Sequence, residues 1–385
     1  MKKSLISLAL IIVTTVLAGY FLKDRLTPLF FRPTLPAVNL GVNLPNILPT
    51  NKPTQPPANQ VPDWAVVAEN LSIPWAVAFL PSGEMLVTER PGNLLKIGLD
   101  KTVIKIEGVR HVGEGGLQGL TLHPNFANNN SIYLFLTAQG KNGLINRVER
   151  YQLIGEQLEN RTVIIDNLPG AQFHDGGRLA FGPDQKLYIT TGDASQSSQA
   201  QNLNYLGGKI LRLNDDGSTP DDNPFENSPV WSYGHRNPQG LAWDDQGRLW
   251  ATEHGRSGAQ SGYDELNLIE AGKNYGWPNI QGDETQAGMT KPVIHSGPNS
   301  TWAPAGALYF NQSIFFTGLR GEALYQYQLE TKELKTHFFQ AFGRLRAVTL
   351  GPDGFFYLST SNTDGRGSVR DKDDKIIKIN PAIFE

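Results

Sequence analysis

The sequence predicts an all-β protein, a six-bladed β-propeller whose ring is closed by strands from both ends of the chain. Three observations support this. A strand–turn–strand unit recurs along the chain, its turns carry Pro, Asp and Gly, and the composition is turn-rich, with 40 glycines and 25 prolines among 385 residues. Short strands that recur every roughly 40–60 residues are typical of propellers, with one unit in each blade.

The third unit shows the pattern most clearly. Leu179–Phe181 is a short apolar run, and residues 182–185 read Gly-Pro-Asp-Gln. This is turn chemistry, because proline presets φ and aspartate tolerates the turn backbone. Residues 187–190 are β-branched and aromatic, as expected of a strand. The six units, and hence the six expected blades, contain residues 76–88, 120–135, 179–190, 241–252, 307–317 and 348–359.

The chain is expected to have three parts. Lys2 and Lys3 precede an apolar run over residues 5–22. That run fits a signal peptide and is also close to the ~18–20 residues that span a bilayer, so residues 1–31 are either a cleaved signal or a membrane anchor. Residues 32–62 hold eight prolines and form a Pro/Asn-rich linker. Residues 63–385 form the propeller, closed by residues 65–69 pairing beside residues 375–379.

Composition narrows the function. The net charge of −3 and the absence of Lys/Arg runs exclude a strongly basic nucleic-acid surface, so no nucleic-acid partner is expected. The chain has no cysteine, which excludes disulfides, cysteine-ligated zinc and iron–sulfur clusters. The N-terminal segment predicts an exported, periplasmic protein that contacts the membrane only through that segment.

A polar loop leads into the third unit. His174 and Asp175 stand beside Gly176 and Gly177 there. An imidazole with an unperturbed pKa of about 6.5 is suited to taking a proton at neutral pH, so His174 is the candidate base. An ordinary loop histidine is the alternative. Asp193, after the following strand, either orients a neighbour or caps a turn.

Basic and amide side chains stand before other units. Arg236 and Asn237 precede the fourth unit, and Glu114 precedes the second. Arg236 is a fixed cation and Asn237 offers both a donor and an acceptor, which suits an anionic, oxygen-rich ligand. Glu114 is either a ligand-facing group or a solvent-facing loop carboxylate. Loops at equivalent blade positions converge on one end of the central channel, which predicts a single site.

Further arginines are expected at the starts of the last two blades. Arg320 is assigned to blade five, and Arg344 and Arg346 to blade six. Alternate strand residues share a face, so Arg344 and Arg346 should point the same way and bind an anion between them. Surface exposure is the alternative. Separately, residues 253–256, 264–268 and 273–278 place carboxylate and carbonyl oxygens on irregular loops, as a hard cation such as Ca²⁺ requires.

Several of these segments together resemble the soluble pyrroloquinoline quinone (PQQ)-dependent glucose/sorbosone dehydrogenase family, and especially its aldose dehydrogenase branch. The resemblance runs from about Leu71 to Ile379. It rests on residues 113–126, 173–195, 207–225, 233–240, 264–278 and 344–346. It implies a six-bladed propeller, in agreement with the repeat count, and PQQ and Ca²⁺ as cofactors. The implied substrate is an aldose, and the electrons pass to an external acceptor.

The resemblance also implies roles for single residues. His174 takes the general-base position, and the segment with Arg236 and Asn237 contacts the quinone. Arg344 and Arg346 match a clamp for the cofactor carboxylates, and Arg320 stands where the family has a lysine or similar cation.

The metal positions follow from the same resemblance. Gly255 and Arg256 match the segment whose carbonyls hold the cofactor-linked calcium, and Glu265 and Tyr275 match a further calcium position. Glu114 departs from the family, which often has glutamine there. A carboxylate beside an anionic quinone is repelled unless it is protonated or paired with an arginine. Phe173, before the base, replaces a polar residue.

The implied reaction is oxidation of the sugar at C1 to a lactone, with His174 taking the hydroxyl proton. Two other functions fit a six-bladed propeller. One is a calcium-dependent lactone hydrolase, which needs carboxylates and asparagines around one Ca²⁺ in place of the arginines. The other is a non-catalytic binding module, which the fold alone does not exclude.

Overall fold

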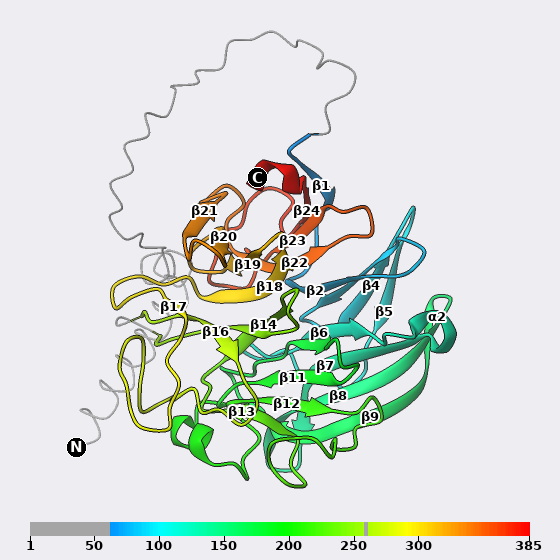
Figure 1. Ribbon diagram of the computed structural model, residues 1–385. Helices are drawn as coiled ribbons and strands as arrows, with labels where there is room; N and C mark the ends of the chain where they lie inside the picture. The colour runs from blue at the N-terminus through cyan, green and yellow to red at the C-terminus, as the bar shows by residue number, and fades with distance from the viewer. Residues whose placement is uncertain (1–61, 258–260) are drawn as a thin grey trace, which may run out of the picture.

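The computed structural model of the protein describes residues 62–257 and 261–385. The expected signal or anchor segment, and all of the expected linker except residue 62, lie outside the described residues. Six four-stranded antiparallel sheets follow one another around a ring, which confirms the predicted six-bladed propeller (Figure 1). Among the described residues, no helix is long and apolar enough to span a membrane.

In each blade, neighbouring strands pair antiparallel from the channel outward, and in blade six the outermost strand comes from the N-terminal side of the described chain. Blade one contains β2 (Pro74–Phe79), β3 (Met85–Glu89), β4 (Asn93–Ile97) and β5 (Lys101–Lys105). Blade two contains β6 (Leu117–Leu122), β7 (Ser131–Gly140), β8 (Gly143–Ile154) and β9 (Gln157–Pro169). Blade three contains β10 (Leu179–Phe181), β11 (Leu187–Thr191), β12 (Lys209–Leu213) and β13 (Val230–Tyr233).

Blade four contains β14 (Pro238–Trp243), β15 (Leu249–Glu253), β16 (Glu265–Ile269) and β17 (Ile294–His295). Blade five contains β18 (Pro304–Phe310), β19 (Ser313–Gly318), β20 (Ala323–Gln328) and β21 (Leu334–His337). Blade six contains β22 (Leu345–Leu350), β23 (Phe356–Thr360), β24 (Ile376–Ile379) and β1 (Trp64–Ala68). The short helices are α2 (Phe126–Asn129), η1 (Ser197–Gln201) and η3 (Pro381–Phe384). The six predicted units are the two inner strands of the six blades.

The ring closes as expected. β1 pairs antiparallel with β24, with Trp64 opposite Ile379 and Ala65 opposite Lys378. Figure 1 shows the blue N-terminal strand β1 beside the C-terminal strand β24. Closure removes two open sheet edges and joins both ends of the described chain into one blade.

The apolar core lies between the blades. One buried cluster occupies each blade–blade interface. Strand alternation supplies both faces of a blade: Leu249 and Ala251 of β15 pack towards blade three, and Trp250 packs towards blade five. The inner strands are therefore buried on both faces, which fixes their ends rigidly around the channel.

Candidate active site

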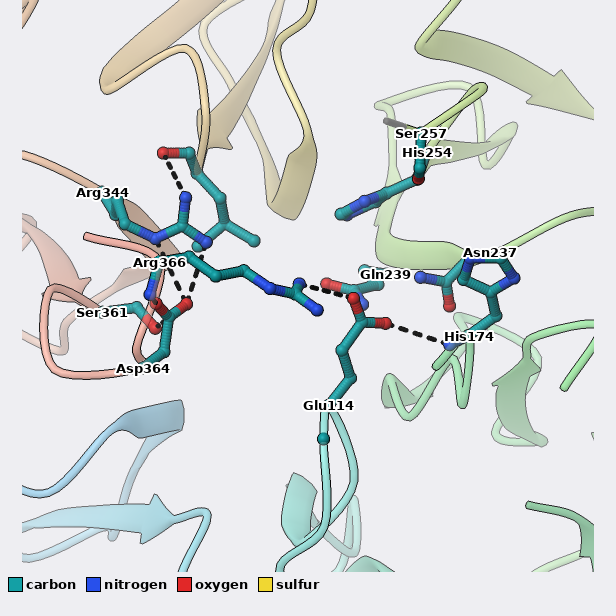
Figure 2. Close-up of polar contacts among 12 residues, drawn as sticks. Glu114, His174, Asn237, Gln239, His254, Ser257, Arg344, Ser361, Asp364 and Arg366 are labelled. Atoms are coloured by element: carbon teal, nitrogen blue, oxygen red, sulfur yellow. Dashed lines mark hydrogen bonds and ion pairs between the residues drawn. The ribbon is translucent and has the colours of Figure 1, made fainter. Parts of the chain in front are cut away.

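The candidate residues lie at one end of the channel. An inner strand starts there, and the second strand of each blade ends there, because the two strands run antiparallel. Glu114 precedes β6, His174 precedes β10, and Arg344 precedes β22. Figure 2 shows these three side chains converging from different blades.

The assignment of Arg320 to the start of blade five is wrong. It lies in the turn between β19 and β20. The outward turn after a second strand also lies at the site end of the ring, so Arg320 still lines a pocket with Glu114 and Arg344. Burial lowers the pKa of its guanidinium.

The candidate base is held by its backbone and by its ring. His174 adopts a left-handed conformation with φ of 64°. Its N–H donates to Glu114 Oε2 at 3.0 Å, and its carbonyl accepts from Ala194 N at 3.1 Å. Its Nδ1 lies 2.8 Å from Asp193 Oδ1. These contacts keep in place a backbone conformation that is unfavourable for residues other than glycine.

Asp193 both orients the base and caps a turn, so both readings of this residue from the sequence apply. Its Oδ1 also accepts from Ser195 N at 2.8 Å, and its Oδ2 accepts from Trp277 Nε1 at 2.9 Å. A carboxylate oxygen only accepts, so His174 Nδ1 carries the hydrogen and Nε2 keeps its lone pair. No other described residue hydrogen-bonds Nε2. The imidazole is therefore arranged to accept a proton.

Arg236 and Asn237 lie beside the base. The Arg236 guanidinium donates to Ser257 Oγ at 2.8 Å and lies 5.3 Å from the centre of the Trp277 ring. Arg236, Ser257 and Trp277 line one pocket together with His174. Burial lowers the pKa of Arg236. Asn237 Oδ1 accepts from Gly176 N at 2.9 Å, which ties the histidine loop to blade four.

Arg344 and Arg346 are both buried but have different partners. Arg344 Nη2 donates to Asp364 Oδ2 at 2.8 Å, while Arg346 Nη1 donates to Gln239 Oε1 at 2.7 Å. The register of β22 shifts between Leu345 and Ala347, so simple alternation does not apply at this point. Arg344 is neutralised by an internal carboxylate. Arg346 has no salt-bridge partner among the described residues.

Several hydrogen-bond donors among the described residues are buried without a partner, and Arg256 Nε beside the candidate base is one of them. Four others lie at or next to the ends of inner strands around the channel. They belong to four different blades and are Arg90 Nε, Arg178 Nη2, Asn237 Nδ2 and Arg346 Nε. A buried donor without a partner is costly, and three of these belong to cations. A ligand that carries several negative oxygens would satisfy such a ring of donors.

Two of these donors, Arg178 and Arg90, are not among the site residues predicted from the sequence. Arg178 lies within residues 173–195, where His174 is the residue expected to act. Arg90 directly follows β3, as His254 directly follows β15, and Asp193 lies two residues after β11. A search of the residues just after each second strand would have found it.

The four residues expected to hold metal line one pocket together with Glu253. Gly255 N donates to Asp264 Oδ1 at 2.8 Å, and Arg256 pairs with Gly262 through backbone hydrogen bonds. The Tyr275 hydroxyl donates to Leu268 O at 2.6 Å and accepts from Glu270 N, so it is already satisfied.

The acidic part of this pocket is better suited to a cation. Glu265 on β16 stands opposite Glu253 on β15. Burial raises the pKa of Glu265 well above its usual value, and the charges of Glu253 and Asp264 raise it further. A cation would relieve that repulsion. Within residues 62–257 and 261–385, however, no group of three or more His, Asp or Glu side chains could hold a metal, so backbone carbonyls would have to complete the shell.

Comparisons with known proteins show the family of the chain. Residues 71–370 match the family described as Glucose / Sorbosone dehydrogenase. The aldose sugar dehydrogenase YliI of Escherichia coli is 32% identical over 359 residues, covering 82% of this chain and 92% of that protein. The quinoprotein glucose dehydrogenase B of Acinetobacter calcoaceticus is 36% identical over 277 residues, covering 62% of this chain and 57% of that protein.

A solved structure is similar over the whole propeller. The PQQ-bound form of the aldose sugar dehydrogenase of Streptomyces coelicolor superimposes with a TM-score of 0.75 and 38% sequence identity. The match covers 82% of this chain and 97% of that one.

Proposed function

Because the chain belongs to the glucose/sorbosone dehydrogenase family and is a quinoprotein sugar dehydrogenase, we propose that it oxidises aldoses at C1 to lactones, with PQQ and Ca²⁺ as cofactors. The electrons then pass to an external acceptor. The enzyme is exported and works in the periplasm, either free or held by its N-terminal segment.

The observation that carries this proposal is the ring of unpartnered donors. PQQ has three carboxylates, and Arg90, Arg346 and Asn237 each present a buried N–H without a partner. These donors would bind the carboxylate and carbonyl oxygens of the cofactor and fix its orientation in the channel. The arginines also separate this proposal from a calcium-dependent lactone hydrolase, whose metal would need carboxylates in their place.

His174 performs the proton transfer in this proposal. When bound, PQQ supplies the electron acceptor that takes the hydride from C1. The Nε2 atom of His174 takes the proton of the anomeric hydroxyl, the C1–H bond breaks, and the lactone C=O forms. Asp193 holds the ring in the required tautomer and stabilises the imidazolium that results.

Calcium would bind beside Arg236, in the pocket that Gly255, Arg256, Glu265 and Tyr275 line. Glu265, which is half-buried, supplies a carboxylate, and Gly255, Arg256 and Tyr275 can contribute only backbone carbonyls to a hard cation. A cation there would add positive charge beside the anionic cofactor.

The test is to identify the product. Purified protein is supplied with PQQ, CaCl₂, an acceptor dye and D-glucose, and the product is analysed by NMR. We expect gluconolactone or its hydrolysis product. The matched control substrate is 1,5-anhydroglucitol, which lacks the anomeric hydroxyl and should not react. Oxidation at another carbon, or equal reaction with the control sugar, would refute the assignment.

A further inference from the structure

An ion pair crosses the mouth of the channel between distant parts of the chain. Arg366, in the loop between β23 and β24, places Nη1 2.6 Å from Oε1 of Glu114, which precedes β6. The two residues are separated by 252 positions. Figure 2 shows the extended Arg366 side chain meeting Glu114 between Arg344 and His174.

The carboxylate of this pair is ionised. Burial alone would raise the pKa of Glu114, but the charge of Arg366 and the N–H of His174 together lower it well below its usual range. The Glu114 side chain is only 16% exposed, so water screens its charge poorly. The ion pair with Arg366 and the hydrogen bond from His174 therefore both favour the charged form of Glu114.

That charge lies close to the donors assigned to the cofactor, because it acts on the guanidinium groups of both Arg90 and Arg346. Glu114 and Arg366 also line one pocket with Arg344. An ionised carboxylate beside an anionic cofactor is repulsive unless a cation neutralises it. A glutamine would avoid this repulsion, but its amide has only one acceptor oxygen. The carboxylate of Glu114 accepts from His174 N with Oε2 and from Arg366 Nη1 with Oε1.

Arg366 is fixed in place for this role. Its backbone N–H donates to Asp364 Oδ1 at 2.9 Å, and Asp364 also binds Arg344. Its guanidinium lies 5.6 Å from the centre of the Phe173 ring. Phe173 directly precedes the candidate base. Arg366 therefore contacts both the Phe173 ring and Glu114, and Glu114 in turn accepts the N–H of His174.

We propose that Arg366 is a further residue of the cofactor site, whose role is to neutralise Glu114, so that a carboxylate can hold the backbone of His174 without repelling the anionic cofactor. This inference rests on the proposed function. It explains the two departures from the family together: Glu114 needs Arg366, and Phe173 supplies the surface on which Arg366 rests.

The test compares R366Q, E114Q and the double variant E114Q/R366Q. The affinity for PQQ is measured by isothermal titration calorimetry in CaCl₂, and the melting temperature of each apoprotein is recorded. R366Q leaves the Glu114 charge uncompensated and should weaken PQQ binding by at least about tenfold. The double variant E114Q/R366Q has neither charge of the pair and keeps the donors assigned to the cofactor. It should therefore bind PQQ with an affinity within about threefold of that of the wild type.

The matched control is R370Q. Arg370 lies in the same loop, is exposed, and donates to the carbonyls of Ala341 and Gln340. In the part of the chain that the structure describes, its hydrogen bonds go to Asp373, Ala341 and Gln340, none of which belongs to the proposed site, and R370Q should bind PQQ like the wild type.

Three results would overturn the inference: unchanged PQQ affinity in R366Q, a double variant as weak as R366Q, or weaker binding in E114Q alone. The second would mean that Arg366 binds the cofactor directly. If R366Q does not fold, the E114Q and double variants still decide the question. A wild-type protein that binds no PQQ would instead refute the proposed function, so the two failures are distinguishable.

Discussion

The Nδ1 atom of His174 lies 2.8 Å from the Oδ1 atom of Asp193, and this contact selects the tautomer of the proposed base. The two residues lie on either side of the inner strand pair of blade three. The second strand returns Asp193 to the end of the ring from which the first strand leaves His174. A propeller blade thus places a base and its orienting acid together without a long loop.

The first prediction concerns this pair. H174Q should lower turnover by about 10²–10⁴-fold, the usual contribution of a positioned base. PQQ affinity should change little, because none of the four unpartnered donors belongs to the imidazole. D193N should also lower turnover, because an amide can donate to Nδ1 and move the hydrogen to Nε2. Steady-state kinetics and PQQ titration measure the two effects.

H123Q is the control for this prediction. His123 follows β6, at the opposite end of the blade, and contacts Asp215. Its turnover should equal that of the wild type. Near-normal turnover of H174Q would contradict this assignment and mean that another group acts as the base. His254 would then be the first residue to test.

The second prediction separates the two clamp arginines. R346A should weaken PQQ binding strongly, by about 2–5 kcal/mol, because its unpartnered Nε is free for the cofactor. R344A should weaken it less, because Asp364 already neutralises Arg344. Calorimetry gives both affinities. A larger loss in R344A than in R346A would contradict this ranking.

The third prediction concerns the metal. EDTA treatment should remove activity and lower the melting temperature, because an ion that binds only the folded chain stabilises it, by about 2.7 kcal/mol at a hundredfold excess over its Kd. CaCl₂ should restore both quantities. E265Q should reduce the calcium-dependent shift in melting temperature. A stripped protein with full PQQ-dependent activity would rule out the calcium assignment.

The fourth prediction concerns pH and stability. Burial raises the pKa of Asp175 to about 7, and the nearby Glu114 charge adds to this, while two hydrogen bonds oppose it. The unfolded chain loses this proton near its ordinary pKa of 3.8, whereas the folded chain keeps it to about pH 7. The unfolded state therefore binds fewer protons between these values, and stability falls as pH rises through that window.

D175N removes this titration. Relative to the wild type, its free energy of unfolding should rise between about pH 4 and pH 7, by up to about 4 kcal/mol. Urea unfolding at several pH values measures the difference. D221N, on an exposed loop, is the control for the loss of one carboxylate. A constant difference between D175N and wild type across this range would refute the assignment.

The sequence predicted the blades well because each inner strand pair has a recognisable turn. The segment from Gly182 to Gln185 is the clearest example, and the pairing of β1 with β24 follows from the need to close the ring. Apart from the closing pair β1 and β24, the outer strands carry weaker patterns, and the sequence does not locate them individually. Arg320 was misplaced because it was assigned to the start of an inner strand, whereas it lies in the turn after the second strand of blade five.

The ion pairs and hydrogen bonds of the site could not be predicted from the sequence, because they join residues that are far apart in the chain. Glu114 and Arg366 meet only when blades two and six are brought around the channel. The same holds for Arg346 and Gln239, which are 107 positions apart. Strand periodicity predicts which face a side chain occupies, but it does not predict which partner from another blade lies opposite.

The central claim is that the ring of buried donors binds PQQ and that His174 then acts on an aldose. The most direct measurement is dye reduction by glucose while PQQ is titrated into the apoprotein with CaCl₂ present. The account predicts that the rate rises with added PQQ and saturates when each chain holds a single cofactor, and that H174Q binds PQQ with little dye reduction. A wild-type rate that stays at the protein-free level at every PQQ concentration would contradict the account.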